Sequence, residues 1–169
     1  IESGSIGSGD LITVLPSGQT SRVRSVRTFD GAVERAQAPQ SVTVVLEDQL
    51  DISRGEVLAA TGSLPMVSRE FDATLCWLTT EPFNRGRRYL IKQGTRVVKA
   101  LLSSPQYRTN VNTLEREAAD TFVLNDIGRI SIKTAQPIAF EPYRRNRSAG
   151  SFIVIDETSN NTVAAGMIE

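Results

Sequence analysis

Apolar and polar residues alternate with a period of two through much of the 169-residue chain. In residues 71–77, the odd positions hold Phe, Ala, Leu and Trp, while the even positions hold Asp, Thr and Cys. This period is typical of a β-strand with one buried face. The same alternation, or a short β-branched run, predicts further strands at residues 11–15, 21–28, 41–46, 56–59, 89–92, 95–99, 120–123, 129–133, 151–156 and 162–168. Of these, 41–46 is apolar enough to be buried on both faces.

Turn-forming residues separate these runs at nearly even intervals, as in Asp51–Gly55. Gly31–Gln40 is predicted as a loop, and Gln93-Gly94 as the turn of a hairpin. Helical periodicity is almost absent. Asn112, with Glu115 three residues later, predicts a capping box, but only for a turn or two of helix. Many short strands with regular turns indicate an antiparallel barrel or sandwich.

The length of the chain allows one large domain or two small ones. Thr61–Pro65 combines small residues with a proline, which favours a linker there. We therefore predict two β-domains with a boundary near residues 61–68.

Composition excludes several classes of chemistry. The 19 basic and 19 acidic residues cancel, so there is no general attraction for nucleic acid or an anionic membrane. The absence of histidine excludes Ser-His-Asp triads, Cys-His pairs and histidine metal sites. The single cysteine, Cys76, excludes an intramolecular disulfide. No apolar run is long enough to span a bilayer and the first residues are too polar for a signal peptide, so we expect a soluble, cytoplasmic protein.

The residue pattern predicts no catalytic, cofactor-binding or metal-binding residues. Gly4 and Gly9 have the glycine spacing of a phosphate-binding P-loop, but Asp10 and Leu11 stand where that loop needs Lys and Ser or Thr. A carboxylate at the lysine position would repel phosphate, so this segment is predicted to be a turn. Cys76 is predicted to pack as a small buried hydrophobe rather than to react.

Two basic clusters are candidates for interfaces. The first surrounds residues 89–99 and is predicted to be a solvated sheet edge, although basic residues on a β-ribbon also suit an RNA backbone. Its members are Arg85, Arg87, Arg88, Lys92, Arg96 and Lys99. The second cluster, Arg144, Arg145 and Arg147, lies in a predicted loop, and loops on a rigid scaffold more often carry contacts. These three arginines and Arg54, in a turn, are the predicted interface residues.

Several motifs carry a resemblance to a known family. In the first half they are Gly9-Asp10, Leu15–Gly18, Thr28–Gly31, Leu46–Asp48 and Asp51–Gly55; in the second they are Leu124–Gly128, Pro137, Tyr143, Gly150–Ile153 and Thr162–Met167. Together they resemble the second and third domains of the large, GTP-binding subunit of bacterial sulfate adenylyltransferase (ATP sulfurylase), within the translation-factor GTPase superfamily. Phe29–Gly31 and Asp51–Gly55 separate this family from elongation factors Tu and 1-alpha. The resemblance covers nearly the whole chain.

The resemblance implies an all-β fold of two antiparallel β-barrels, of the elongation-factor domain 2 and domain 3 type, at residues 1–62 and 66–169. The first barrel would lack its N-terminal strand. The resemblance also implies a C-terminal fragment, because such subunits begin with a GTPase domain, and its P-loop and guanine-recognition motif do not occur in this sequence.

In this family, GTP hydrolysis by the large subunit drives the synthesis of adenylylsulfate (APS) from ATP and sulfate in sulfate assimilation. Adenylation takes place on a separate small catalytic subunit, and in some members an adenylylsulfate kinase domain follows the third domain. The resemblance therefore implies a non-catalytic fragment, with GTP, Mg and ATP bound elsewhere in the parent protein. The implied partners are the GTPase domain, the small subunit and, in fused members, the kinase, but no membrane. The alternative is the tRNA- or RNA-contacting barrels of a translation GTPase, which the zero net charge disfavours.

Overall fold

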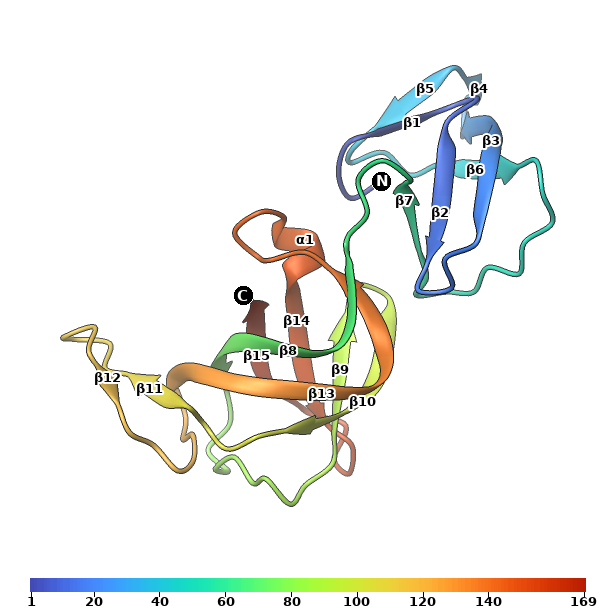
Figure 1. Ribbon diagram of the computed structural model, residues 1–169. Coiled ribbons are helices and arrows are strands. Elements are labelled where there is room, and N and C mark those ends of the chain that lie inside the picture. Colours follow the sequence, from blue (N-terminus) through green and yellow to red (C-terminus); the bar gives the residue numbers. More distant parts are fainter. The chain divides into compact units, whose positions relative to one another are not determined.

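The computed structural model describes residues 1–169, which divide into two compact units, Ile1–Met66 and Val67–Glu169 (Figure 1). Strands make up nearly all the regular structure of both units, and the one helix, α1 (Arg147–Gly150), has four residues. No helix in the chain has the length and apolar character needed to cross a membrane. The predicted all-β class is confirmed.

Seven short strands build the first unit. They are β1 (Ser5–Gly7), β2 (Leu11–Leu15), β3 (Thr20–Thr28), β4 (Gly31–Val33), β5 (Arg35–Gln37), β6 (Thr43–Leu46) and β7 (Val57–Ala60). Strands β4, β3, β2 and β7 follow one another in an antiparallel sheet, β6 also pairs with β3, and β1 pairs with β5. Inward residues of β2, β3 and β5 form the buried core, namely Ile12, Val14, Val23, Val26 and Ala36.

Three details of this unit differ from the sequence predictions. Residues 31–40 are not simply a loop, because they contain β4 and β5, with Gly31 at a φ of 126° where the β3–β4 hairpin turns. The segment predicted as a glycine-rich turn likewise contains β1. Strands of three residues are too short for a period of two to be recognised. Strand β6 is confirmed, but the prediction that it is buried on both faces is wrong, because its apolar residues are only half-buried.

Eight strands and α1 build the second unit. The strands are β8 (Met66–Trp77), β9 (Tyr89–Gln93), β10 (Arg96–Leu102), β11 (Tyr107–Thr109), β12 (Arg116–Glu117), β13 (Ile127–Phe140), β14 (Ser151–Asp156) and β15 (Thr162–Ile168). Six of them close into a barrel in the order β10-β9-β14-β15-β8-β13, with β13 pairing back onto β10. The β11–β12 hairpin extends from β13 beyond the barrel (Figure 1).

Barrel closure overturns the prediction of a solvated sheet edge at residues 89–99. The hairpin itself is confirmed, but β9 pairs with β10 and β14, and β10 pairs with β9 and β13, so neither strand is an edge. Two of the six basic side chains of this region pair with acidic neighbours. Arg87 pairs with Glu81, and Lys99 Nζ lies 2.7 Å from Glu157 Oε1.

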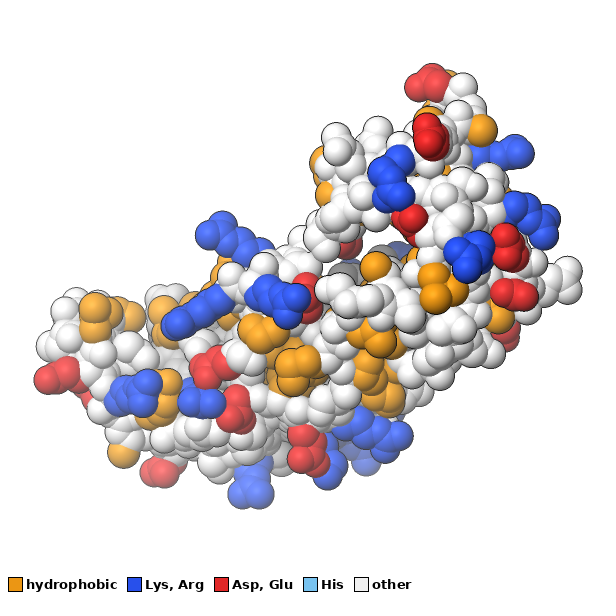
Figure 2. Space-filling model, turned by 45° about the horizontal axis from the view of Figure 1, so that its top comes forward, with side chains coloured by type: hydrophobic (Ala, Val, Ile, Leu, Met, Phe, Trp, Pro, Cys, Tyr) orange, Lys and Arg blue, Asp and Glu red, His pale blue; other side chains and the backbone are white.

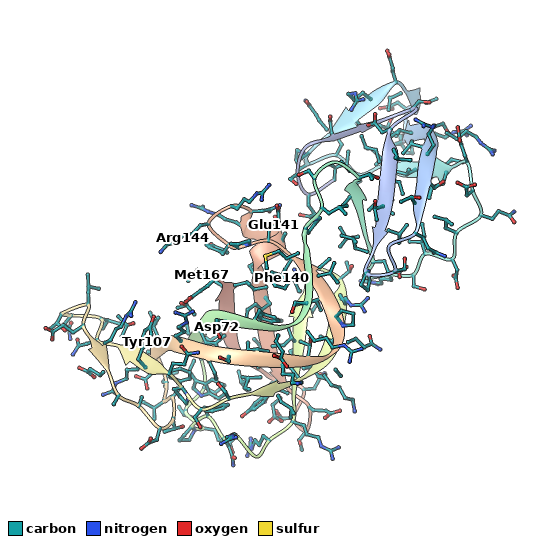
Figure 3. All side chains as sticks on the ribbon, viewed as in Figure 1. Asp72, Tyr107, Phe140, Glu141, Arg144 and Met167 are labelled. Atoms are coloured by element: carbon teal, nitrogen blue, oxygen red, sulfur yellow. The ribbon has the colours of Figure 1, made fainter.

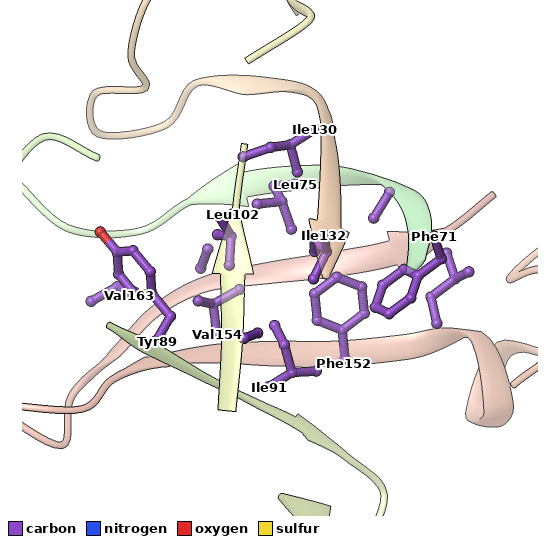
Figure 4. Packing of buried hydrophobic residues seen from close by; sticks show 14 of the residues in the cluster. Phe71, Leu75, Tyr89, Ile91, Leu102, Ile130, Ile132, Phe152, Val154 and Val163 are labelled. Carbon is purple, nitrogen blue, oxygen red and sulfur yellow. The ribbon is translucent and has the colours of Figure 1, made fainter. Parts of the chain in front are cut away.

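The alternation predicted for residues 71–77 is confirmed, because the four apolar residues of this stretch point into the barrel. Figure 4 shows part of this core, in which inward residues from all six strands pack together. Trp77 contacts Phe83 and Tyr89 edge-to-face, with ring centroids 5.6 and 6.2 Å apart, and its indole Nε1 donates to the Glu81 carbonyl at 2.8 Å. A buried Trp with a satisfied N–H is a structural residue.

The helical turn predicted near Asn112 is wrong. Residues 111–113 form a turn of the β11–β12 hairpin, and Asn110 Oδ1 accepts from the N–H groups of Asn112 and Thr113. The one helix is α1, whose N-cap is Asn146. Residues 120–123 are also not a strand, because Val123 is held in a turn by the carboxylate of Asp126, which accepts from its N–H at 2.9 Å.

A buried carboxylate organises the turn between β14 and β15. Asp156 Oδ1 accepts from the N–H of Ser159 at 2.8 Å, the N–H of Thr158 at 3.0 Å and the hydroxyl of Ser159 at 3.1 Å. Arg87 Nη1 lies 3.4 Å from Asp156 Oδ2. The Ser159 N–H is the main cause that lowers the pKa of Asp156, and the other donors act in the same direction.

We expect Gly128→Ala to lower the free energy of unfolding of the second unit by about 2 kcal/mol, because overpacking a rigid contact typically costs this much. A Cβ atom at position 128 would lie 2.3 Å from the Tyr107 carbonyl oxygen and 2.5 Å from a ring carbon of Phe122. Urea denaturation followed by the fluorescence of Trp77, the only tryptophan, measures the change. The control Gly86→Ala meets only a side-chain oxygen of Asn84 at 3.2 Å and should change stability little. Equal stability of the two variants would contradict the packing described here.

We expect Asp156→Asn to lower stability at pH 7 by about 1.5 kcal/mol, because hydrogen bonds to a buried charged group are lost or weakened. The pKa of Asp156 is lower in the folded state, so its stabilisation is complete above the unfolded pKa of about 3.9 and is lost as the pH falls through that value towards the folded pKa. The variant should therefore lose less stability than the wild type on acidification. Asp120→Asn, at an exposed position, is the control, and parallel acid profiles for Asp156→Asn and the wild type would refute the assignment.

Candidate protein-interaction surface

Three of the four predicted interface arginines lie on one short segment of the second unit. This segment, residues 141–147, is called the arginine loop; it runs from the end of β13 into α1, and Arg147, predicted to lie in a loop, is the first residue of that helix. The Pro142 carbonyl accepts from the N–H groups of Arg145 and Asn146, which turns the chain, and the Asn146 side chain then caps the helix through the N–H of Ala149. The sequence Pro142-Tyr-Arg-Arg-Asn146 therefore folds into a turn followed by a cap.

Close packing holds the arginine loop rigidly. A Cβ atom at Gly150 would lie 2.4 Å from Tyr143 Cα and 2.7 Å from the Glu141 carbonyl oxygen, so only glycine allows the end of α1 to touch the loop backbone. The Tyr143 N–H also donates to the Ile168 carbonyl at 2.8 Å, which joins the loop to β15. Gln93 Nε2 donates to the Ala149 carbonyl at 2.5 Å. The loop is thus fixed to the barrel at several points.

The arginines of the loop differ in what they contact. Arg145 Nε lies 3.2 Å from Glu141 Oε1, so its charge is partly neutralised within the loop. Arg144 and Arg147 are exposed and form no ion pair. Figure 3 shows Arg144 extending away from the barrel. Arg54 is also exposed, but it lies in the turn before β7 of the first unit, so the structure does not gather it with the other three in one unit.

An apolar groove lies beside the arginine loop, and Tyr143 of this loop is one of the residues that line the groove. This outer groove has a volume of about 540 Å³ and is formed by outward residues of β8, β14 and β15. They are Thr74, Cys76, Ser151, Ile153, Ala165 and Met167, with Lys92 among the remaining lining residues. Figure 2 shows hydrophobic side chains reaching the surface of the barrel unit next to basic ones. A solvent-facing sheet surface is usually polar, so this apolar lining suits a protein contact.

Sequence reasoning missed the groove and misplaced one of its residues. Cys76 was predicted to be buried, but it lies half-exposed on the outer face of β8, because the even positions of this strand point outward. The available signal was the run of apolar residues without alternation in β14 and β15, which places apolar side chains on both faces. Apolar side chains on the outer face of such a strand favour contact with another protein surface, as those on the inner face favour contact with the core.

A polar network adjoins the groove through Thr74, whose hydroxyl donates to Glu169 Oε1 at 2.9 Å. Arg129 Nη2 lies 2.9 Å from Asp72 Oδ2 and 3.0 Å from Glu169 Oε2. The Ser131 hydroxyl, donating to Asp72 Oδ1 at 2.6 Å, is the main cause that lowers the pKa of Asp72, and Arg129 adds to it. A carboxylate held ionised in this way is a poor proton acceptor. The network therefore ties β8, β13 and Glu169 together.

The described residues contain no group of three or more His, Cys, Asp or Glu side chains that could hold a metal ion. The chemistry that the arrangement supports is recognition: two unpaired guanidinium groups on a rigid loop, next to an apolar groove. Arginine beside apolar surface is a frequent composition of protein interfaces.

Comparison with known proteins places this geometry in a family. A family model described as "GTP-eEF1A C-terminal domain-like" matches residues 70–169. The chain is 46% identical over 168 residues to sulfate adenylyltransferase subunit 1 of Bacteroides fragilis, covering 99% of this chain and 35% of that protein. It is 44% identical over 168 residues to the bifunctional enzyme CysN/CysC of Rhodopirellula baltica, covering 99% and 26%, respectively. The chain thus spans only about a third of the first relative and about a quarter of the second.

A solved structure of Sup35 complexed with GDP is similar with a TM-score of 0.88, at 19% sequence identity, over 99% of this chain and 42% of that one. At this identity the likeness concerns the fold alone, and it confirms the predicted elongation-factor type of β-barrel. The resemblance to the large subunit of sulfate adenylyltransferase is confirmed by the relatives that bear that name. Since the family model covers more than half of its residues, the chain belongs to the GTP-eEF1A C-terminal domain-like family.

Proposed function

We propose that this chain is the two-barrel, C-terminal part of the GTP-binding subunit of sulfate adenylyltransferase, with residues 1–62 and 66–169 as its second and third domains. In this role it couples GTP hydrolysis to adenylylsulfate synthesis from ATP and sulfate, in the cytoplasm, during sulfate assimilation. The observation that carries the proposal is the 46% identity to sulfate adenylyltransferase subunit 1, which extends across both compact units.

The proposed role is mechanical rather than catalytic. GTP, Mg and ATP would bind to the GTPase domain and the small catalytic subunit, and none of them to these barrels. Asp72 and Asp156, two carboxylates with lowered pKa values, are both engaged in structural hydrogen bonds, which fits a part without an active site. The similarity to a bifunctional CysN/CysC enzyme supports the proposal that an adenylylsulfate kinase is a further partner in some members.

The outer groove and the arginine loop are the proposed docking face for the GTPase domain. Coupling requires a surface whose contacts differ between the GTP and GDP states of its partner, since equal contacts would shift no equilibrium. A rigid loop bearing Arg144 and Arg147 supports this role, because a small movement of a carboxylate on the partner would make or break the pairing. The groove next to it offers apolar area that desolvates the contact.

Isothermal titration of GTP into the 169-residue chain should show no binding. The reason is that the phosphate loop and the guanine-recognition motif expected of a GTPase are not among these residues. The matched positive control is an intact GTP-binding subunit that includes the GTPase domain. A micromolar affinity of the two-barrel chain for GTP would refute the proposal that GTP binds to the GTPase domain and not to these barrels.

Arg144→Ala combined with Arg147→Ala should weaken binding of a separately produced GTPase domain, loaded with a non-hydrolysable GTP analogue, by about tenfold, at a cost typical of two lost interface charges. Arg145→Ala is the control, because Glu141 already engages that guanidinium. Binding is measured by biolayer interferometry at two salt concentrations, and the weakening should be greater at low salt. An unchanged affinity of the double variant would exclude the loop from the docking face.

The same variant separates the proposal from the alternative of RNA-contacting barrels. If the wild type binds total tRNA and the double variant has a shallower dependence of log affinity on log salt, the arginines contact phosphates. That outcome would favour the translation-GTPase alternative. The family comparisons instead favour sulfate activation, because the relatives at 41–46% identity are sulfate adenylyltransferase subunits.

A further inference from the structure

The outer groove has a regular floor, because its outward residues form two rows that cross neighbouring strands. The pairing registers of β9, β14, β15 and β8 place these residues side by side. The first row is Lys92, Ile153, Ala165 and Cys76, and the second is Ser151, Met167 and Thr74. With strands about 4.8 Å apart and residues about 3.3 Å apart along each strand, the floor measures about 14 Å by 7 Å.

Cations without an acidic partner border this floor on two sides. Lys92 stands at one end of the first row, where it is exposed and forms no ion pair. The arginine loop forms a second border, since Tyr143 of this loop lines the groove. In that loop, Arg144 and Arg147 are exposed and form no ion pair either. A partner in the groove therefore meets three cations whose charge no side chain of this unit balances.

The carboxylates of the second unit leave this charge uncompensated. Glu141 in the arginine loop and Glu169 at the end of the chain are each engaged by an arginine, at 3.2 and 3.0 Å. Among the acidic residues at positions 67–169, only Glu115 and Asp120 have no ion pair, and neither of them lines the groove. The surface that complements the groove is therefore apolar at its centre and acidic at its border.

Closure of the barrel decides which backbone conformation fits the groove. Strands β9, β14, β15 and β8 each pair with a neighbour on both sides, so none of them has a free edge to which a further strand could be added. An extended segment laid on this face would bury backbone groups without partners. An α-helix satisfies these groups internally, and the 14 Å row corresponds to about nine residues of helix. The segment that fits is an amphipathic helix.

We infer that an amphipathic α-helix of the GTPase domain, with carboxylates beside Lys92 and Arg144, occupies the outer groove, an inference that rests on the proposed function. The floor covers only about 100 Å², whereas each of two separate proteins buries about 800 Å² in a stable complex. A contact this small suffices between parts of one polypeptide, because they meet at a high effective concentration. The apolar face of the helix packs on Ile153, Ala165 and Met167, and its acidic border pairs with the cations.

Cys76, at the end of the first row, reports whether the groove is covered. It is the only cysteine of the 169-residue chain, and it is half-exposed there. Iodoacetamide should alkylate Cys76 about tenfold more slowly in the intact GTP-binding subunit, loaded with a non-hydrolysable GTP analogue, than in the 169-residue chain, because the helix excludes the reagent. Mass spectrometry of the peptide that contains Cys76 measures both rates.

A charge reversal tests the acidic border of the helix. Lys92→Glu in the intact subunit should raise the alkylation rate of Cys76 about fivefold, because the carboxylates are then repelled. The same substitution in the 169-residue chain should leave the rate unchanged, since Lys92 and Cys76 lie at opposite ends of the row. Arg88→Glu is the matched control, because Arg88 is exposed, has no ion pair and does not line the groove. It changes the net charge equally and should not alter the rate.

Hydrogen–deuterium exchange identifies the segment that covers the groove. In the intact subunit, Lys92→Glu should accelerate exchange about tenfold in one helix of the GTPase domain, because this helix loses its contact with the barrel. Arg88→Glu should leave that helix as protected as in the wild type.

The outcomes separate this inference from the proposed function. Equal alkylation of Cys76 in the intact subunit and in the 169-residue chain would overturn the inference, and so would equal effects of Lys92→Glu and Arg88→Glu, or faster exchange in a segment that is not a helix. In each of these cases the proposed function stands as long as the 169-residue chain binds no GTP, whereas GTP binding by that chain overturns the proposed function itself. Protection of Cys76 in the 169-residue chain by total tRNA would overturn the protein helix in favour of an RNA contact.

Discussion

The structure of the second unit depends on the pairing of β10 with β13, in which Ala100, Leu101 and Leu102 lie opposite Thr134, Lys133 and Ile132. This ladder joins the two ends of a six-stranded sheet. Without it, both end strands would expose unpaired backbone groups, and the inward side chains of β10 and β13 would lie at an edge. Because the barrel is closed, the inward side chains of all six strands pack in one core, and the outward side chains are available for contacts with other molecules.

The outer surface of the barrel uses this freedom in two ways. Next to the arginine loop, β14 and β15 are apolar on both faces, and Gly150 lets the loop pack directly against α1. At the other surface, Gly128 lets the β11–β12 hairpin cross close to β13, with its base held by ion pairs. In both cases a glycine without room for a side chain fixes the segment beside it. For the arginine loop, rigid display reduces the entropy that a binding partner has to overcome.

The two surfaces differ in their physical character. The arginine loop has guanidinium groups without carboxylate partners, so its contacts depend on charge and on salt. The tip of the β11–β12 hairpin, residues 110–114, contains no charged residue and exposes Val111 and Leu114, although Glu115 and Arg116 beside it are exposed charges. Under the proposed function, the charged surface is the one whose contacts can change with the state of a partner.

The sequence by itself determined the all-β class, the alternation in residues 71–77, the hairpin at residues 89–99 and the family, because these depend on local periodicity or on local motifs. It also located the cluster of arginines at residues 144–147. It did not reveal that Arg145 has an acidic partner while Arg144 and Arg147 have none, since the pairing of Arg145 with Glu141 depends on the fold of the loop. Only the tertiary structure decided that β10 pairs with β13, that a groove lies beside Cys76, and that Leu114 lies at a positive φ. The physical reason is that each of these features depends on residues distant in sequence or on a turn whose geometry no local propensity predicts. Short strands such as β4 and β5 escaped prediction for the related reason that pairing, rather than periodicity, makes them strands.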